Sequence, residues 1–150
     1  MEDSKKTIET YTYSLCDNDK IGKSVWVALI SYKNTERLLT GISHCASKNR
    51  AELYSIYSAL KVLKEPCKVH VYSDSQFVTN AFNLKWIERW QDKGWKMRHH
   101  DSFPNLDVWK ALLPLLDYHD VSIEWINMPE SLPKALICKK KAEQLFSYGA

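Results

Sequence analysis

Residues 47–63, SKNRAELYSIYSALKVL, and residues 71–78, VYSDSQFV, are the two stretches that decide the fold of this 150-residue chain. Apolar residues recur every three or four positions in the first stretch, which predicts an amphipathic helix with Ser47 as its N-cap. The second stretch ends a run of period-two alternation, which predicts a strand. Glu52 then falls in the first turn of the helix, and Asp74 falls just past the strand. If the helix crosses beside the strand, the two carboxylates converge.

The remaining segments add strands before this helix and more helices after it. Strands are predicted at residues 7–16, 23–32, 37–44, 67–73 and 121–127, helices at 49–63, 75–85, 105–116 and 132–148, and a partly helical segment at 86–95. The resulting order is β-β-β-α-β-α-α-β-α. Three strands joined by short turns favour an antiparallel meander, and two strands joined through helices extend it. We therefore expect an α/β fold, a mixed five-stranded sheet with helices packed on it, as a single domain over residues 1–150.

The charge, the N-terminus and the cysteine spacing bear on which classes of protein this chain can belong to. The formal net charge of +3 does not by itself indicate a nucleic-acid binder. The N-terminus, MEDSKKTIET, lacks the apolar centre of a secretory signal, and no apolar run approaches the roughly 18 residues of a membrane span. The cysteines are widely spaced without a CxxC pair, which indicates neither a zinc site nor a disulfide framework. We expect a monomeric, cytoplasmic protein that does not bind membranes and keeps its thiols reduced.

Two readings are open for the acid pair. The carboxyl edge of an α/β sheet is where ligands bind, and hard oxygen ligands there suit Mg²⁺ or Mn²⁺. Taken singly, however, Glu52 is a favourable charge for the first turn of a helix, and Asp74 precedes a helix as an N-cap does. Each residue alone is therefore more typical of a structural role than of catalysis.

A wider set of motifs makes the pair more specific. The segments YTYSLC, NRAEL, YSDSQFV, WIERWQDKGWK, NLDVWKAL and IEWI run in this order between Thr10 and Phe146. In order and spacing the chain resembles a type 1 ribonuclease H. The resemblance implies the mixed five-stranded fold. It also implies a two-metal site, built from four acids, that hydrolyses the RNA strand of an RNA–DNA hybrid.

The resemblance covers only the middle two acids of that site, which match Glu52 and Asp74. Tyr13 stands at the position of the first acid and Lys139 at that of the fourth, and the preceding loop at 127–131, NMPES, lacks the family's His. A neutral phenol and an ammonium do not compensate divalent cations. We expect Lys139 to pair with Asp74 or Glu52 instead, Mg²⁺ or Mn²⁺ binding to be weak or absent, and cleavage to be absent or very slow.

Nearby acids offer a possible rescue of the site. Asp17 and Asp19 follow the first strand, and Glu143 lies one helical turn beyond Lys139. Each would need a displaced backbone to reach the site, so we do not expect any of them to restore it.

Substrate-binding positions are better represented. Asn49 and Gln76 match side chains that reach into the minor groove of the hybrid, and Ser47 with Lys48 matches the region that holds a DNA phosphate. A basic protrusion is matched by residues 86–100, in which cations alternate with tryptophans: Trp86, Trp90, Lys93, Trp95 and Lys96, flanked by Lys85, Arg89, Arg98, His99 and His100. The alternative is that Trp86 and Trp90, four residues apart, simply pack together.

Three functional hypotheses remain. The first is a non-catalytic ribonuclease H-like protein that binds RNA–DNA hybrid or other double-stranded nucleic acid. The second is an active, metal-dependent ribonuclease with a rearranged site. The third is a protein-interaction module with a protein partner. The loss of two acids favours the first and third, and the tryptophan-basic segment favours the first over the third.

Overall fold

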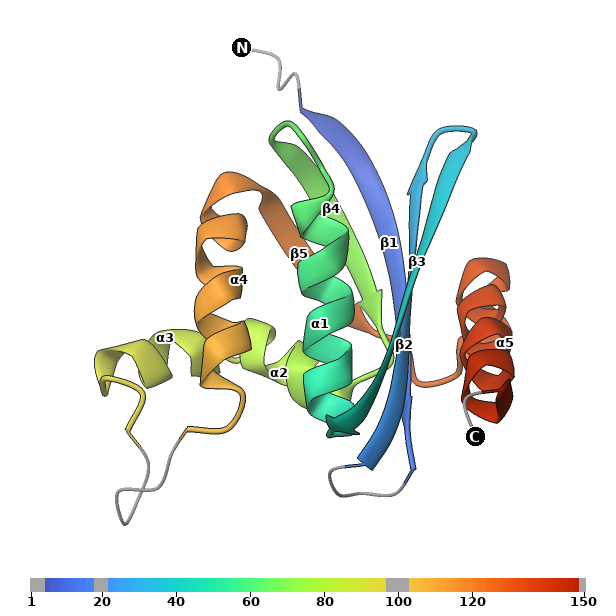
Figure 1. Ribbon diagram of the computed structural model, residues 1–150. Helices are drawn as coiled ribbons and strands as arrows, with labels where there is room; N and C mark the ends of the chain where they lie inside the picture. The colour runs from blue at the N-terminus through green and yellow to red at the C-terminus, as the bar shows by residue number, and fades with distance from the viewer. Residues whose placement is uncertain (1–4, 18–21, 97–102, 149–150) are drawn as a thin grey trace.

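Five strands form one mixed sheet in the order β3-β2-β1-β4-β5 (Figure 1). This computed structural model describes residues 5–17, 22–96 and 103–148. The strands are β1 (Lys6–Cys16), β2 (Gly22–Tyr32), β3 (Thr35–Ala46), β4 (Cys67–Ser73) and β5 (Asp120–Trp125). β2 is antiparallel to both β1 and β3, whereas β4 runs parallel to β1 and to β5. The predicted mixed five-stranded sheet is confirmed.

The helices cover the two faces of this sheet unequally. They are α1 (Lys48–Lys61), α2 (Gln76–Asn83), α3 (Trp86–Asp92), α4 (Leu106–Tyr118), a 3-10 turn η2 (Pro129–Ser131) and α5 (Pro133–Tyr148). Helices α1 to α4 lie on one side, and α5 lies alone on the other (Figure 1). Three helices, rather than the expected two, separate β4 from β5. The left-handed conformation of Lys85 ends α2 and lets α3 begin as a helix of its own.

Local hydrogen bonds explain where the two decisive helices begin. The Ser47 hydroxyl accepts a hydrogen bond from the backbone N–H of Arg50 at 3.1 Å, and the Ser75 hydroxyl accepts one from Val78 at 3.1 Å. Each bond satisfies a donor that the first helical turn leaves free. The predicted N-cap at Ser47 is therefore confirmed. The second cap fixes the chain immediately after Asp74.

Two apolar clusters hold helices to sheet, one on each face. The larger joins α1 and α4 to the sheet through buried side chains that include Leu53, Leu60 and Trp109. The smaller joins α5 to β1 and β2 and includes Val27 and Cys138. Because both faces of β2 are covered, its middle is apolar throughout, as a buried central strand requires. Within the described residues, no helix is long and apolar enough to cross a bilayer.

The first testable prediction concerns the larger cluster. Leu53 is fully buried, so Leu53→Ala removes apolar contacts and leaves a cavity beneath α1. We expect a loss of about 2–5 kcal/mol in the free energy of unfolding, measured by urea denaturation. Leu38→Ala on the exposed edge strand β3 is the control and should change stability by less than about 0.5 kcal/mol. Equal losses in the two variants would contradict this account of the core.

Candidate active site and nucleic-acid interface

The carboxyl ends of β1 and β4 form the edge on which the candidate site is built. Thr12 and Ser73 face each other in the parallel register of these strands, so Tyr13 and Asp74 follow them side by side. Glu52, on helix α1, lies beside the same strand ends. The Thr12 hydroxyl donates to Glu52 Oε2 at 2.5 Å, and the Ser73 hydroxyl donates to the same oxygen. The structure thus brings the two middle acids and the Tyr13 position to one end of the sheet.

Glu52 is fully buried, with its carboxyl group closed off from solvent. Its other oxygen, Oε1, has no hydrogen-bond partner among the described residues. Burial raises the pKa of Glu52 above its ordinary value, and the negative charge of Asp74 raises it further. Lys48 and the Thr12 and Ser73 hydroxyls act in the opposite direction but do not overcome these two effects. Burial inside the fold therefore favours the neutral form of the Glu52 carboxyl group more than exposure to water would.

Lys48 supplies the positive charge of the site. Its Nζ donates to Asp74 Oδ2 at 2.6 Å and to Ser14 at 2.7 Å for the backbone oxygen and 3.1 Å for the hydroxyl. It lies 5.7 Å from the centre of the Tyr13 ring. The sequence matched Lys48 to a region that holds phosphate, whereas the structure turns it inward onto Asp74. A long flexible stem at the first turn of α1 makes this reach possible.

Lys139 does not pair with Asp74 or Glu52, and that prediction is wrong. Its Nζ lies 3.1 Å from a Glu130 carboxylate oxygen and 3.4 Å from one of Glu143. Glu143 is four residues further along the same helix, a spacing at which side chains meet on one helix face. The Lys139 ammonium is therefore paired with Glu130 and Glu143 and not with the acids at the sheet edge. The same contacts leave Glu143 engaged rather than available to replace the missing fourth acid.

Tyr13 itself is half-buried. Burial raises the pKa of its phenol above the ordinary value, and Asp74 raises it further, against a smaller opposing effect of Lys139. The group is therefore neutral at physiological pH. A neutral phenol beside Asp74 offers a metal ion far less than the carboxylate that the resemblance places there.

The donor set does not fit a pair of divalent cations. In the part of the chain that the structure describes, no group of three or more His, Cys, Asp or Glu side chains could hold a metal ion. Asp74 Oδ2 already accepts from Lys48, and Glu52 Oε1 is buried without a hydrogen-bond partner among the described residues. Asp17 lies in the described part, whereas Asp19 lies outside it. Two carboxylates beside a fixed ammonium leave most of the charge of two Mg²⁺ or Mn²⁺ ions uncompensated.

The tryptophans of the predicted interface pack against one another and against the core. The Trp86 and Trp90 rings lie 6.3 Å apart, and Trp90 lies 5.2 Å from the buried Trp109. Trp90 and Trp95 both meet Phe103, at 4.9 and 5.2 Å. The packing alternative for Trp86 and Trp90 is thus correct, although all three side chains remain half-exposed.

Polar and basic groups surround this aromatic cluster. Asn49 and Trp90 line one cavity of about 270 Å³ together with Phe77, and Gln76 is exposed beside Phe77. Lys93 and Lys96 are exposed at the end of α3 and just after it. Ser47 is committed to its capping bond. Arg98, His99 and His100 lie outside the described residues.

An ion pair that the sequence did not signal clamps α1 to α4. The guanidinium of Arg50 donates to both carboxylate oxygens of Asp107, at 2.9 and 2.7 Å. This two-pronged hydrogen bonding lowers the pKa of Asp107 to about 2. No local spacing relates the two residues, so only the assembled fold reveals the pair.

Comparison with known proteins identifies the family. The model of the ribonuclease H (RNase H) family matches residues 5–135. The chain belongs to the ribonuclease H family. A ribonuclease H from Caldicellulosiruptor saccharolyticus is 40% identical over 122 residues, which cover 81% of this chain and 83% of the relative. One from Chlorobium phaeobacteroides strain DSM 266 is 37% identical over 140 residues, which cover 93% and 95%. The family match ends before Lys139.

Solved structures agree on the fold. LC9-RNase H1, described as a type 1 RNase H with the type 2 active-site motif, superposes with a TM-score of 0.82 at 16% identity, covering 96% of this chain and 74% of that protein. A foamy viral protease-reverse transcriptase in complex with an RNA/DNA hybrid superposes with a TM-score of 0.66 at 14% identity, covering 93% of this chain and 19% of that protein. Both likenesses concern the fold alone.

The buried carboxyl group leads to a pH prediction. Because its pKa is raised, Glu52 favours the folded state below its ordinary value of 4.5 and loses this contribution as the pH rises through the raised pKa. Glu52→Gln removes the titration and keeps an acceptor for Thr12 and Ser73. We therefore expect the unfolding free energy of this variant, relative to the unmodified protein, to increase from pH 4.5 toward neutral pH by about 1–3 kcal/mol.

Urea denaturation at several pH values measures this effect. Glu88→Gln, an exposed acid on α3, is the matched control and should show no such trend. A constant difference between Glu52→Gln and the unmodified protein across this range would contradict the raised pKa.

Proposed function

We propose that this RNase H family member binds RNA–DNA hybrid or related double-stranded nucleic acid without efficient metal-dependent cleavage. The observation that carries the proposal is the Lys48 ammonium seated on Asp74 and Ser14. A positive charge covalently attached to the chain already balances Asp74. A divalent cation would have to displace it and would gain only Asp74 and the buried Glu52 as anionic ligands.

The surroundings of Asp74 strengthen the argument. Tyr13 contributes a neutral phenol where the resemblance places a carboxylate, and Lys139, at the position of the fourth acid, is a cation paired with Glu130 and Glu143. At a separation of 4 Å, two unit charges in a partly solvated site interact by about 4 kcal/mol. Lys48, which contacts Asp74 directly, therefore opposes the approach of Mg²⁺ or Mn²⁺. When bound in this family, such ions activate water and stabilise the leaving oxygen.

Nucleic-acid binding draws its support from parts of the chain away from Lys48. Half-exposed aromatic rings and exposed lysines around α3 offer stacking surfaces and phosphate contacts together. Asn49 and Gln76 sit at the starts of α1 and α2, beside the aromatic cavity. The free thiols of Cys67 and Cys138 suit a reducing, cytoplasmic location.

The second candidate is an active ribonuclease with a rearranged site. Two observations favour it: Glu52 Oε1 lacks a partner, as a ligand awaiting a cation would, and relatives at 37–40% identity are named Ribonuclease H. Such an enzyme would need Lys48 to leave Asp74 when substrate and metal bind. A cleavage assay separates the two candidates.

We expect no efficient cleavage of a labelled RNA–DNA hybrid by the unmodified protein in Mg²⁺ or Mn²⁺. The triple variant Tyr13→Asp, Lys48→Asn and Lys139→Asp restores carboxylates and removes both cations. Its cleavage rate should rise by roughly a hundredfold, the scale of one well-placed electrostatic contribution to catalysis. Adding Asp74→Asn to this variant should abolish the gain. Efficient cleavage by the unmodified protein that Asp74→Asn abolishes would establish the second candidate instead.

Hybrid binding is expected to depend on the basic segment and on salt. Replacing Lys93 and Lys96 with Gln should weaken binding of a labelled hybrid in an anisotropy titration. It should also reduce the slope of log affinity against log salt by roughly 0.9 per lost phosphate contact. Lys33→Gln, at the far end of the sheet, is the matched control. Absence of binding at low salt would contradict the proposal and favour a protein-interaction module.

A further inference from the structure

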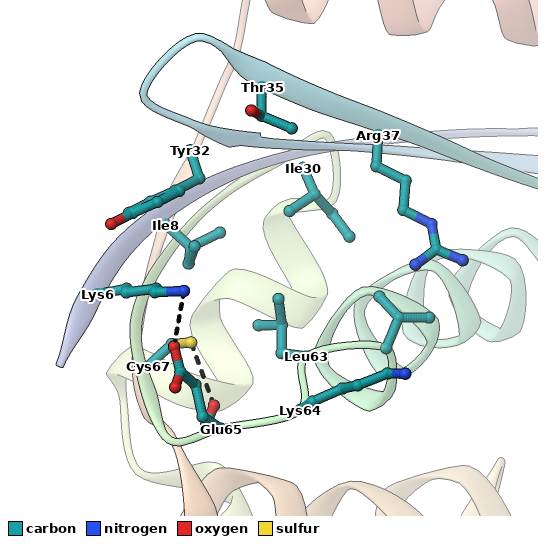
Figure 2. A pocket seen from close by; sticks show the side chains of 11 residues that line it. Lys6, Ile8, Ile30, Tyr32, Thr35, Arg37, Leu63, Lys64, Glu65 and Cys67 are labelled. Carbon is teal, nitrogen blue, oxygen red and sulfur yellow. Dashed lines mark hydrogen bonds and ion pairs between the residues drawn. The ribbon is translucent and has the colours of Figure 1, made fainter.

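We propose that a pocket at the hairpin end of the sheet binds a small organic carboxylate with a flat apolar body. This hairpin-end pocket has a volume of about 430 Å³ and lies between the β2–β3 hairpin and the chain that follows α1. Its lining includes Ile8, Ile30, Tyr32, Arg37, Leu63 and Lys64 (Figure 2). The volume falls in the range of pockets that hold small molecules.

The hairpin-end pocket is remote from the acids. Lys6 and Cys67, which line it, pair at the starts of β1 and β4. Asp74 follows the opposite end of β4, seven positions beyond the start of that strand. A ligand here would therefore neither contact the candidate active site nor depend on its chemistry, so the inference is independent of the proposed function.

Apolar side chains form the floor and walls. Ile8, Ile30 and Cys67 are buried beneath the opening, and Tyr32 and Leu63 are half-buried at its sides. Burial raises the pKa of the Cys67 thiol, so this sulfur is neutral and behaves as part of the apolar floor. Tyr32 also lines the pocket, with the Lys6 ammonium 5.3 Å from the centre of its ring, and an aromatic ring in the lining suits an aromatic or similarly planar ligand.

Charged side chains lie at both ends of the pocket. Lys6 and Glu65 form an ion pair at 2.9 Å and balance each other. Arg37 and Lys64 make no ion pair within the described residues, and Figure 2 shows the guanidinium and the ammonium at the same end, with Leu63 between that end and the Lys6–Glu65 pair. The planar fork of a guanidinium matches the two oxygens of a carboxylate, and a nearby lysine adds a point charge.

One feature opposes an anion. The carboxyl end of α1 points toward this region, and the last carbonyls of a helix carry partial negative charge. Two of these carbonyls are already engaged, because the backbone N–H groups of Val62 and Leu63 donate to Ser58 and Leu60. With Arg37 and Lys64 as full charges against partial ones, the pocket favours an anion.

Three probes separate the parts of the proposal. Naphthoate carries both the carboxylate and the flat apolar body, naphthamide has the same shape without the charge, and acetate has the charge without the body. We expect naphthoate to bind the full chain saturably below about 1 mM, as a ligand of this size should. Naphthamide and acetate should each bind at least about tenfold more weakly. Isothermal titration gives the affinities.

Matched variants locate the site. Arg37→Gln and Lys64→Gln alter exposed side chains, so both should fold, and each should weaken naphthoate binding by about tenfold. Lys61→Gln removes an equal charge from the last turn of α1, outside the pocket, and should leave the affinity unchanged. Backbone NMR shifts on titration should cluster at Ile8, Ile30 and Cys67.

Several results would overturn the proposal. Equal affinity for naphthamide would reduce the site to an apolar pocket, and equal affinity for acetate or inorganic phosphate would reduce it to an anion site. Loss of affinity in Lys61→Gln comparable to that in Arg37→Gln would indicate a general charge effect. NMR shifts confined to α3 would place the ligand elsewhere.

Discussion

The hydrogen bonds to the buried carboxyl group of Glu52 are the interactions on which the carboxyl edge of the sheet depends. It accepts hydroxyl donors from Thr12 on β1 and Ser73 on β4, and so joins α1 to two neighbouring strands through one oxygen. Those strands are parallel and adjacent in register, so the bond also fixes the positions that follow each of them. A buried acid is costly, and this one is retained at the place where three separate elements must meet.

The positive charge at the carboxyl edge of the sheet comes from the lysine side chain that contacts Asp74. Lys48 on α1 contacts Asp74, whereas Lys139 on α5 pairs with Glu130 and Glu143 instead. The Tyr13 ring lies close to the Lys48 ammonium, so the cation beside it is a side chain of the protein. The Lys48–Asp74 contact differs from a metal site in two respects. An ammonium carries a single positive charge, and it binds its partners through hydrogen bonds.

Sequence reasoning succeeded where the relevant contacts are local or periodic. The bounds of β4, the cap at Ser47 and the convergence of Glu52 with Asp74 follow from period-two alternation, capping chemistry and sheet topology. It did not predict the Lys48–Asp74 contact, the partners of Lys139 or the Arg50–Asp107 ion pair, because a long side chain can reach several partners that only the assembled fold brings close. Helix α3 lies in the segment predicted to be partly helical, but the predicted element order did not count it as a separate helix, because Lys85, a non-glycine residue, adopts the left-handed conformation that separates it from α2.

The Lys48–Asp74 contact also bears on how the protein responds to its ionic surroundings. A ligand that binds only the folded state stabilises it in proportion to its concentration, so a metal-dependent edge becomes less stable when a chelator removes the ion. Lys48 is part of the chain, so its ammonium has a constant effective concentration beside Asp74. The Lys48–Asp74 ion pair therefore contributes to the folded state whether or not divalent cations are present.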